Sequence, residues 1–239
     1  ESKEEFRKAK DMEFHLFQGF FFSRPSIAMK SSHKVTPKAQ YARLLSELKE
    51  DEPSFQTLAE IIETDVHMAY RLMRIASRRS EEEVLYSIKR ALIYMGLREF
   101  ERWINILMLQ DFGRDKPPEL TRISLIRSRM AESIALQSGL KKNSREASLM
   151  GLFSVLDAMF DTTMGEALQE ISLPESIIDA LVYRRGSLYP IYNLLLSYEK
   201  GDLIMVQYWT KTLNLDVSTL YRDYVGAIVW TSEIFNLIN

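Results

Sequence analysis

An all-α fold is predicted for most of this chain, and three observations predict it. Apolar residues recur at helical spacing from residue 37 to the C-terminus, and no strand-like alternation follows residue 36. Residues that favour helix N-caps stand directly before several of these periodic segments. Only 9 Gly and 7 Pro interrupt the 239 residues, which leaves little room for long irregular segments. We therefore expect a helical bundle of about ten helices.

The first 36 residues differ from the rest. Residues 4–10 favour a helix, and residues 16–22 (Leu-Phe-Gln-Gly-Phe-Phe-Phe) form one apolar run of the length of a buried strand. A helix and one strand make no domain, and unpaired strand edges favour aggregation, so this piece must dock on a partner. Residues 26–36 show no periodicity and are predicted to form a linker. The main domain is predicted to span residues 37–239.

Capping residues mark the first helices of that domain. Thr36 precedes Pro37, which suits the first helical position, and Ser54, Asp65 and Ser87 precede three further apolar segments. Gly96 is expected to end the helix that Ser87 begins. The remaining predicted helices cover residues 97–112, 119–138, 144–160, 164–171, 175–185, 188–199, 203–213 and 217–237.

Composition excludes several classes of protein. The net charge of −2, from 31 basic and 33 acidic residues, argues against a protein that mainly neutralises nucleic-acid phosphates. The chain has no Cys, so disulfides, thiolate metal sites and sulfur redox chemistry are excluded. It shows no signal-peptide pattern and no apolar run near the roughly 20 residues of a membrane span, and a cytoplasmic protein without membrane contact is expected.

Residues 147–161 resemble the metal-bearing central helix of HD-type phosphohydrolases. That family shows Gly-Leu-Leu-His-Asp-Ile-Gly where this chain has Gly151-Leu-Phe-Ser154-Val155-Leu-Asp157. Ser154 then stands at the position of the ligating His, and Val155 at that of the ligating Asp. A hydroxyl and a valine cannot anchor a hydrolytic metal. The resemblance therefore implies the fold without its chemistry, and we expect no catalytic residue, no metal and no cofactor.

A longer series of motifs resembles the HDOD domain, the HD-related output domain of bacterial signalling proteins. The motifs are Tyr41-x-x-Leu-Leu-x-x-Leu48, Ile61-Ile-x-x-Asp65-Val, Arg71-Leu-Met-Arg74, Ser87-Ile-x-x-Ala-Leu-x-x-x-Gly96-Leu, Gly151-Leu-Phe-Ser-Val-Leu-Asp157, Leu173-Pro, Ala180-Leu and Tyr198-Glu-x-Gly-Asp202. The resemblance runs from residue 36 to the C-terminus. It implies an all-α, HD-domain-like bundle that acts in signal transduction.

The N-terminal residues resemble the end of an EAL domain, the barrel that hydrolyses cyclic di-GMP. The resemblance rests on Glu1-Ser-Lys-Glu-Glu-Phe and Leu16-Phe-Gln-Gly-Phe-Phe-Phe-Ser-Arg-Pro25. By that match Glu1 falls on the motif's Glu and Gln18 on its active-site Gln, so residues 1–25 are read as a C-terminal EAL remnant. The rest of such an active site lies upstream. We therefore expect this chain to be a piece of a longer EAL–HDOD protein and, by itself, not an enzyme.

Few residues offer catalytic chemistry. The three His residues, at positions 15, 33 and 67, share no helical face, which disfavours a His-based metal site. Asp157 and Asp161 are four apart and are expected on one face of the same helix. Such a pair can bind Mg²⁺ or act in acid–base catalysis. Alternatively, Asp157 caps a helix or bridges to a neighbouring helix through an Arg, and we favour this structural role.

A row of arginines offers a binding surface. Arg71, Arg74 and Arg78 align on one helix face and could grip phosphates or an acidic partner. The other interpretation is a solvated face opposite the apolar stripe. Arginines at positions 122, 127 and 129 would extend the basic area if the fold brings them close.

The leading hypothesis is a non-catalytic output or scaffold module that mediates protein–protein interaction downstream of cyclic di-GMP-type signalling. Its expected partners are the adjacent EAL domain of the parent protein and other signalling proteins, and self-association stays open. The alternative is a regulator that binds nucleotides or nucleic acid through the Arg-rich helix face. A residual enzyme that uses Asp157 and Asp161 ranks third.

Overall fold

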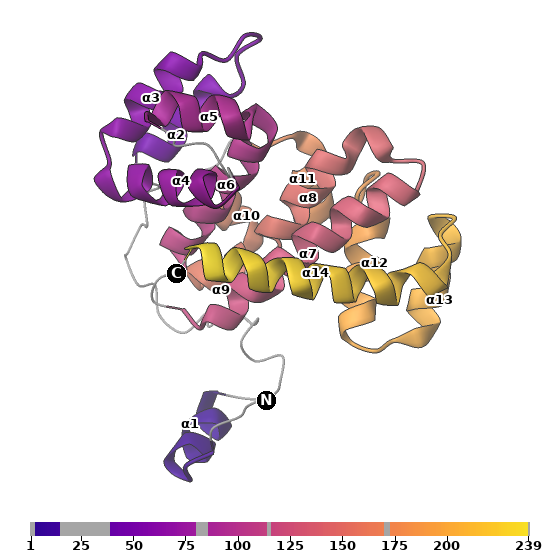
Figure 1. Ribbon diagram of the computed structural model, residues 1–239. Coiled ribbons are helices and arrows are strands. Elements are labelled where there is room, and N and C mark those ends of the chain that lie inside the picture. Colours follow the sequence, from indigo (N-terminus) through magenta and orange to yellow (C-terminus); the bar gives the residue numbers. More distant parts are fainter. Residues whose placement is uncertain (1–2, 15–38, 80–85, 114–115, 170–172, 239) are drawn as a thin grey trace. The chain divides into compact units, whose positions relative to one another are not determined.

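The computed structural model describes residues 3–14, 39–79, 86–113, 116–169 and 173–238, and its regular structure in these ranges is entirely helical (Figure 1). This confirms the all-α fold class. Helix α1 (Lys3–Asp11) matches the helix predicted over residues 4–10. The predicted strand at residues 16–22 and the linker at residues 26–36 lie outside the described residues. After residue 38 the described chain forms thirteen α-helices, α2 to α14, which is more than the predicted number.

The chain divides into two compact units. One contains α2 to α6 together with the last part of α14, and the other contains α7 to α13 together with residues 217–228 of α14. We call them the α2–α6 unit and the α7–α13 unit. None of the described helices has the length and apolar character needed to cross a membrane.

Helices α3, α4 and α5 of the α2–α6 unit begin where the sequence predicts, whereas Thr36 and Pro37, the predicted start of the first helix, lie outside the described residues. The helices of this unit are α2 (Ala39–Glu47), α3 (Phe55–Glu63), α4 (Val66–Arg79), α5 (Ile88–Met95) and α6 (Leu97–Phe112). Ser54 Oγ accepts a hydrogen bond from the backbone N–H of Thr57, and Asp65 Oδ1 accepts one from that of Met68. Ser87 caps α5 in the same way. These bonds satisfy backbone donors that a helix N-terminus leaves unpaired.

Glycine ends α5 as expected. Gly96 has φ +76°, a value that L side chains rarely adopt, and its N–H donates to the carbonyl of Leu92 at 2.8 Å. The turn lets α6 start at the next residue. Helix α5 packs on α3 and α4, and α2 packs on α3 and α6. The core between them is apolar. Its fully buried members include Leu44, Leu58, Ile62, Leu72, Leu92, Phe100 and Leu107.

A tyrosine–carboxylate contact ties α2 to α6. The Tyr41 hydroxyl donates to Asp111 Oδ2 at 2.7 Å, and Arg71 Nη1 lies 3.8 Å from Asp111 Oδ1. Burial raises the pKa of Tyr41 well above its ordinary value, and the Asp111 carboxylate raises it further. The protonated phenol is therefore the form that the folded state requires.

We expect Tyr41→Phe to lower the free energy of unfolding by about 1–2 kcal/mol at neutral pH, because it removes a buried hydrogen bond to a carboxylate. The pKa of Tyr41 is higher in the folded state than in the unfolded state, where it is about 10. The stability that the protonated phenol contributes is therefore fully present below a pH of about 10 and is lost as the pH rises above that value. Urea denaturation near neutral pH and again above pH of about 10 measures both effects. The gap between wild type and variant should shrink at high pH. An unchanged gap would contradict this assignment.

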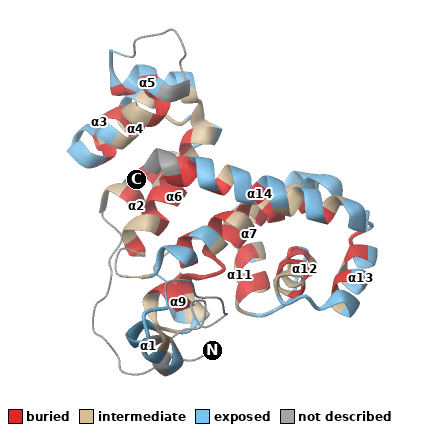
Figure 2. Cartoon of the chain, turned by 60° about the horizontal axis from the view of Figure 1, so that its bottom comes forward, coloured by how far each residue is buried: buried red, intermediate tan, exposed pale blue. Residues whose placement is uncertain are grey.

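The α7–α13 unit is built around one long helix. It comprises α7 (Pro118–Gln137), the short 3₁₀ segment η2 (Lys141–Asn143), α8 (Ser144–Phe153), α9 (Leu156–Phe160), α10 (Met164–Leu168), α11 (Glu175–Leu181), α12 (Tyr189–Glu199), α13 (Leu203–Thr212) and the first half of α14 (Val217–Ile238). Helix α7 is buried along most of its length (Figure 2). It packs most extensively against α8, and α12 packs against α13, α7 and α11.

Small side chains let α7 and α8 approach closely. A Cβ placed on Gly151 would lie 2.5 Å from the backbone oxygen of Arg127, which is inside any allowed contact. The Ser124 hydroxyl donates to the carbonyl of Leu152, and the hydroxyls of Ser128 and Ser148 lie 3.0 Å apart. The glycine is therefore required by the neighbouring backbone rather than by its own dihedral angles.

The prediction of one helix over residues 144–160 is wrong. Helix α8 ends at Phe153 and α9 starts at Leu156, with Ser154 and Val155 between them. The Ser154 hydroxyl donates to the carbonyl of Gly151 at 2.7 Å, which competes with the regular i→i−4 ladder. The Ser154 N–H also bonds to the same carbonyl, at 3.4 Å, and Val155 has φ −119°. The break lies at the two positions that the sequence singled out.

Candidate functional site at the end of helix α8

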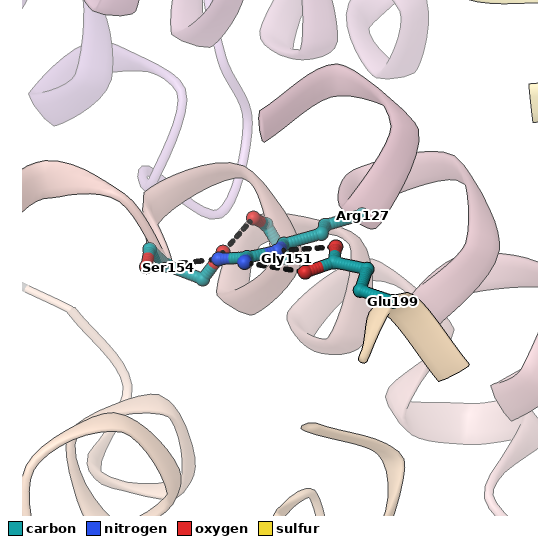
Figure 3. A network of polar contacts seen from close by, with 4 residues as sticks. All are labelled: Arg127, Gly151, Ser154 and Glu199. Carbon is teal, nitrogen blue, oxygen red and sulfur yellow. Dashed lines mark hydrogen bonds and ion pairs between the residues drawn. The ribbon is translucent and has the colours of Figure 1, made fainter. Parts of the chain in front are cut away.

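A buried arginine organises the interior beside this break. Arg127 projects from α7, and its Nε and Nη2 donate to Glu199 Oε1 and Oε2 of α12, each at 2.7 Å (Figure 3). The pair is bidentate, the strongest geometry for a guanidinium and a carboxylate. The Arg127 side chain is only 7% exposed and that of Glu199 is 21% exposed. The ion pair is thus shielded from water.

The same guanidinium reaches the end of α8. Arg127 Nη1 donates to Ser154 Oγ at 3.0 Å and to the Ser154 carbonyl at 3.3 Å. Ser154 Oγ in turn donates to the carbonyl of Gly151 (Figure 3). Carbonyls at a helix C-terminus lack intrahelical partners and carry the negative end of the helix dipole. Arg127 therefore caps α8 while it pairs with α12.

The electrostatics of this cluster favour a charged arginine. Burial alone would lower the pKa of Arg127, but the hydrogen bonds and the negative charge of Glu199 outweigh it and leave the pKa raised. Burial raises the pKa of Asp157 on α9, while the Ala158 N–H and the positive charge of Arg127 oppose that rise. Burial likewise raises the pKa of Tyr192 on α12, and Arg127 opposes it. Arg127 is thus the permanent positive charge of the cluster.

The residue types at the break limit its chemistry. Ser154 uses its hydroxyl for Arg127 and Gly151, and Val155 is buried in the apolar core. Within the ranges that the structure describes, no group of three or more His, Asp or Glu side chains could hold a metal ion. Through the charge of Arg127 this arrangement can hold α7, α8 and α12 together. It also contains a carboxyl group with a raised pKa, that of Asp157.

Asp157 and Asp161 do not form the expected pair on one helix face. Asp157 lies in the first turn of α9, but Asp161 follows the end of that helix with a left-handed φ of +51°. Its Oδ2 lies 2.5 Å from Lys116 Nζ, so it joins α9 to the start of α7. The expectation was wrong because it assumed one regular helix through both residues.

Two of the arginines that could have formed a basic surface are engaged by the chain's own carboxylates. Arg71 is half-buried beside Asp111, and Arg129 Nη1 lies 2.9 Å from Glu132 Oε2. Arg74 is half-buried and has interactions of its own. The Arg78 side chain lies outside the described part of the chain, as do Glu1 and Gln18. These contacts lend no support to the phosphate-binding alternative.

Sequence reasoning missed the central pair. Arg127 was considered only as a surface residue, and its partner lies 72 residues away. Glu199 stands within the motif Tyr198-Glu-x-Gly-Asp202, which was the one available signal. That motif alone does not say which basic residue the carboxylate meets. Lys116, the partner of Asp161, lies in the irregular segment before α7 and gave no signal.

The motif order and the helical arrangement are those expected of an HDOD domain. The chain belongs to the HDOD domain family, whose family model matches residues 36–174. Among curated proteins it is similar to "Cyclic di-GMP phosphodiesterase CdgJ" of Vibrio cholerae serotype O1 (strain ATCC 39315 / El Tor Inaba N16961), with 28% identity over 241 residues, 100% of this chain and 55% of that protein. It is also similar to "Uncharacterized protein YuxH" of Bacillus subtilis (strain 168), with 28% identity over 246 residues, 99% of this chain and 58% of that protein. The chain spans little more than half the length of these relatives. No solved structure matches it.

The name of one relative overturns a prediction. The chain was expected not to be an enzyme, yet CdgJ, about half of which aligns with the whole of this chain, is named a phosphodiesterase. The expectation relied on Ser154, Val155 and the missing upstream part of an EAL site. Those residues describe one location in the fold, and they say nothing about the activity of a protein almost twice as long.

Asp157 offers a test of the electrostatics at this site. Because its pKa is raised in the folded state, the stability that it contributes is complete below its ordinary pKa of about 4 and is lost as pH rises through the folded value. We therefore expect Asp157→Asn to be more stable relative to wild type at neutral pH than in acid. Urea denaturation at two pH values measures this. A variant that loses stability at neutral pH would show that Arg127 requires this second carboxylate.

Proposed function

We propose that residues 37–239 form the output module of a longer protein that hydrolyses cyclic di-GMP, and that this module acts as a scaffold for other signalling proteins. The observation that carries the proposal is the HDOD match at residues 36–174 within a chain whose whole length aligns with 55% of CdgJ. The family assignment supports a role in signalling. The relative's name supports cyclic di-GMP as the signal.

The interior of the α7–α13 unit supports a scaffold role for this region. Ser154 and Val155, the positions that correspond to metal ligands in HD phosphohydrolases, here take part in a buried polar network and an apolar core. A protein–protein surface needs helices that keep fixed relative positions. The bonds from Arg127 to Glu199 and Ser154 hold α7, α8 and α12 in such an arrangement.

The N-terminal residues complete the proposal. Residues 1–25 are the C-terminal remnant of an EAL domain, with Glu1 and Gln18 as its contribution to that domain's site. The alignment with both relatives extends over 99% or more of this chain, so the N-terminal residues are part of the shared sequence. The adjacent EAL domain is then the first partner of the helical module, and residues 26–36 link the two.

The full-length parent protein tests this proposal. Purified protein is assayed for cyclic di-GMP hydrolysis with Mg²⁺ or Mn²⁺, and in parallel the protein is crosslinked in its own cells and the crosslinked peptides are mapped. We expect hydrolysis, and crosslinks to other signalling proteins that fall within residues 37–239. Absence of hydrolysis would contradict the cyclic di-GMP assignment. Crosslinks confined to the rest of the protein would contradict the output role.

A further inference from the structure

One face of the single helix α14 is both apolar and exposed. Tyr221, Val225, Ile228 and Val229 follow one another at helical spacing, so their side chains line up along one side of the helix. Their exposed fractions range from 39% to 70% (Figure 2). We call these four residues the α14 stripe.

The opposite face of α14 is apolar as well. Leu220, Ala227 and Ile234 recur every seven residues along that face, and all three are buried against the rest of the chain. A helix that is apolar on all sides is expected to be buried on all sides. A row of exposed apolar side chains on such a helix marks a surface for another protein.

Two exposed charges on α14 indicate what that protein is. Arg222 and Glu233 are exposed, and the helical repeat places both on the same flank of the α14 stripe. Eleven residues of helix separate them by about 16 Å along the axis, so they cannot pair within one copy. One positive and one negative charge on the same flank are complementary to the same surface turned end to end.

We propose that the α14 stripe is the interface of a homodimer in which the α14 helices of two copies pack antiparallel. Val225 of each copy then lies opposite Ile228 of the second copy, in alternating layers like those of a coiled coil. In this register Arg222 lies within about 3 Å, measured along the axis, of Glu233 of the second copy. The two-fold symmetry forms this ion pair twice. A parallel arrangement would instead place Arg222 beside Arg222.

The size of this surface sets the expected strength of the dimer. One helix face of this length offers on the order of 500 Å² per copy, which is the size class of weak, reversible complexes. We therefore expect monomer and dimer to exchange, with a Kd in the micromolar range. The inference concerns this surface alone and does not depend on the proposed function.

Sedimentation equilibrium of the purified chain, from micromolar to submillimolar concentration, tests the proposal. The average mass should rise from monomer toward dimer with concentration. Tyr221→Asp should weaken the dimer at least tenfold, because it places a charge in an apolar interface. Ile93→Asp, which changes an apolar side chain of α5 that is 55% exposed, is the matched control and should leave the Kd unchanged. A chain that stays monomeric throughout, or equal effects of the two variants, would overturn the proposal.

A charge exchange tests the register. Arg222→Glu and Glu233→Arg should each weaken the dimer, and the double variant should recover the wild-type Kd because both ion pairs form again with reversed sign. A double variant that is weaker than either single variant would contradict the antiparallel pairing.

Disulfide formation tests the orientation of the helices directly. The chain has no Cys, so a cysteine introduced on α14 is its only thiol. An equimolar mixture of Val225→Cys and Ile228→Cys chains should crosslink under mild oxidation faster than either variant alone, because these two positions face each other. If Val225→Cys alone crosslinks as fast as the mixture, the helices are not antiparallel in this register and the proposal fails.

Discussion

Replacing Glu199 with alanine is expected to lower the free energy of unfolding of the α7–α13 unit by about 3–5 kcal/mol. The substitution removes the only carboxylate for which hydrogen bonds to Arg127 are resolved in the described residues, and it leaves a side chain that is 7% exposed with an uncompensated charge. Urea denaturation of the purified chain, followed by circular dichroism, measures the loss.

A second ion pair in the same unit gives a matched control. Asp179 pairs with Arg185 at 2.8 Å, but the Arg185 side chain is 65% exposed. Asp179→Ala should therefore change stability little, because water and salt screen an exposed pair. Equal losses in Asp179→Ala and Glu199→Ala would show that burial is not what makes the Arg127–Glu199 pair important.

The second large effect is expected at Gly151. Gly151→Ala places a methyl group 2.5 Å from the Arg127 carbonyl oxygen and 2.7 Å from the Ser128 backbone nitrogen. Backbone atoms cannot rotate away as a flexible side chain can, so α7 and α8 must separate. Such overpacking costs about 1–3 kcal/mol, and the separation would also lengthen the bond from Ser124 to the carbonyl of Leu152. Chemical denaturation of the variant measures the total loss of unfolding free energy from both effects.

Gly226 supplies the control for this substitution. It lies within α14, and apart from its chain neighbours and the backbone of its own helix no described atom lies within 4 Å of the position that a Cβ would take. Gly226→Ala should therefore raise stability by about 0.5–1 kcal/mol, because alanine loses less conformational freedom than glycine in a helix. If Gly151→Ala behaves like Gly226→Ala, the close approach of α7 and α8 is wrong.

The sequence predicted helix starts better than helix continuity. Ser54, Asp65 and Ser87 were recognisable because an N-cap acts on backbone donors only two or three residues away. The interruption of α8 at Ser154 was not predicted. Hydrophobic periodicity runs through the break, where the Ser154 hydroxyl bonds to the Gly151 carbonyl and also accepts a bond from Arg127 on another helix.

The candidate site was predicted in part. The motif comparison led to Ser154 and Val155, and the structure places both at the break between α8 and α9. The motif comparison could not identify Arg127 as the positively charged side chain beside Ser154. Arg127 and Glu199 are brought together only by tertiary packing of α7 and α12. Local spacing instead suggested a row of arginines on α4, where Arg71 is engaged by Asp111.

The expectation that the chain is not an enzyme was wrong for a related reason, because it too was drawn from local residues. Ser154 and Val155 describe the chemistry of one location, whereas activity belongs to the whole protein. CdgJ, named a phosphodiesterase, has nearly half of its length outside the region that this chain matches. A catalytic site there would leave no trace in the residues around Ser154.

The central structural claim is that one buried positive charge, supplied by Arg127 and balanced by Glu199, holds the interior of the α7–α13 unit together. A double-mutant cycle of Arg127→Met and Glu199→Leu, with unfolding free energies from urea denaturation, tests this claim most directly. Each single variant should be strongly destabilised, and the double variant should be more stable than the sum predicts, with a coupling of about 2 kcal/mol or more. Additive losses, with no coupling between the two residues, would contradict the claim.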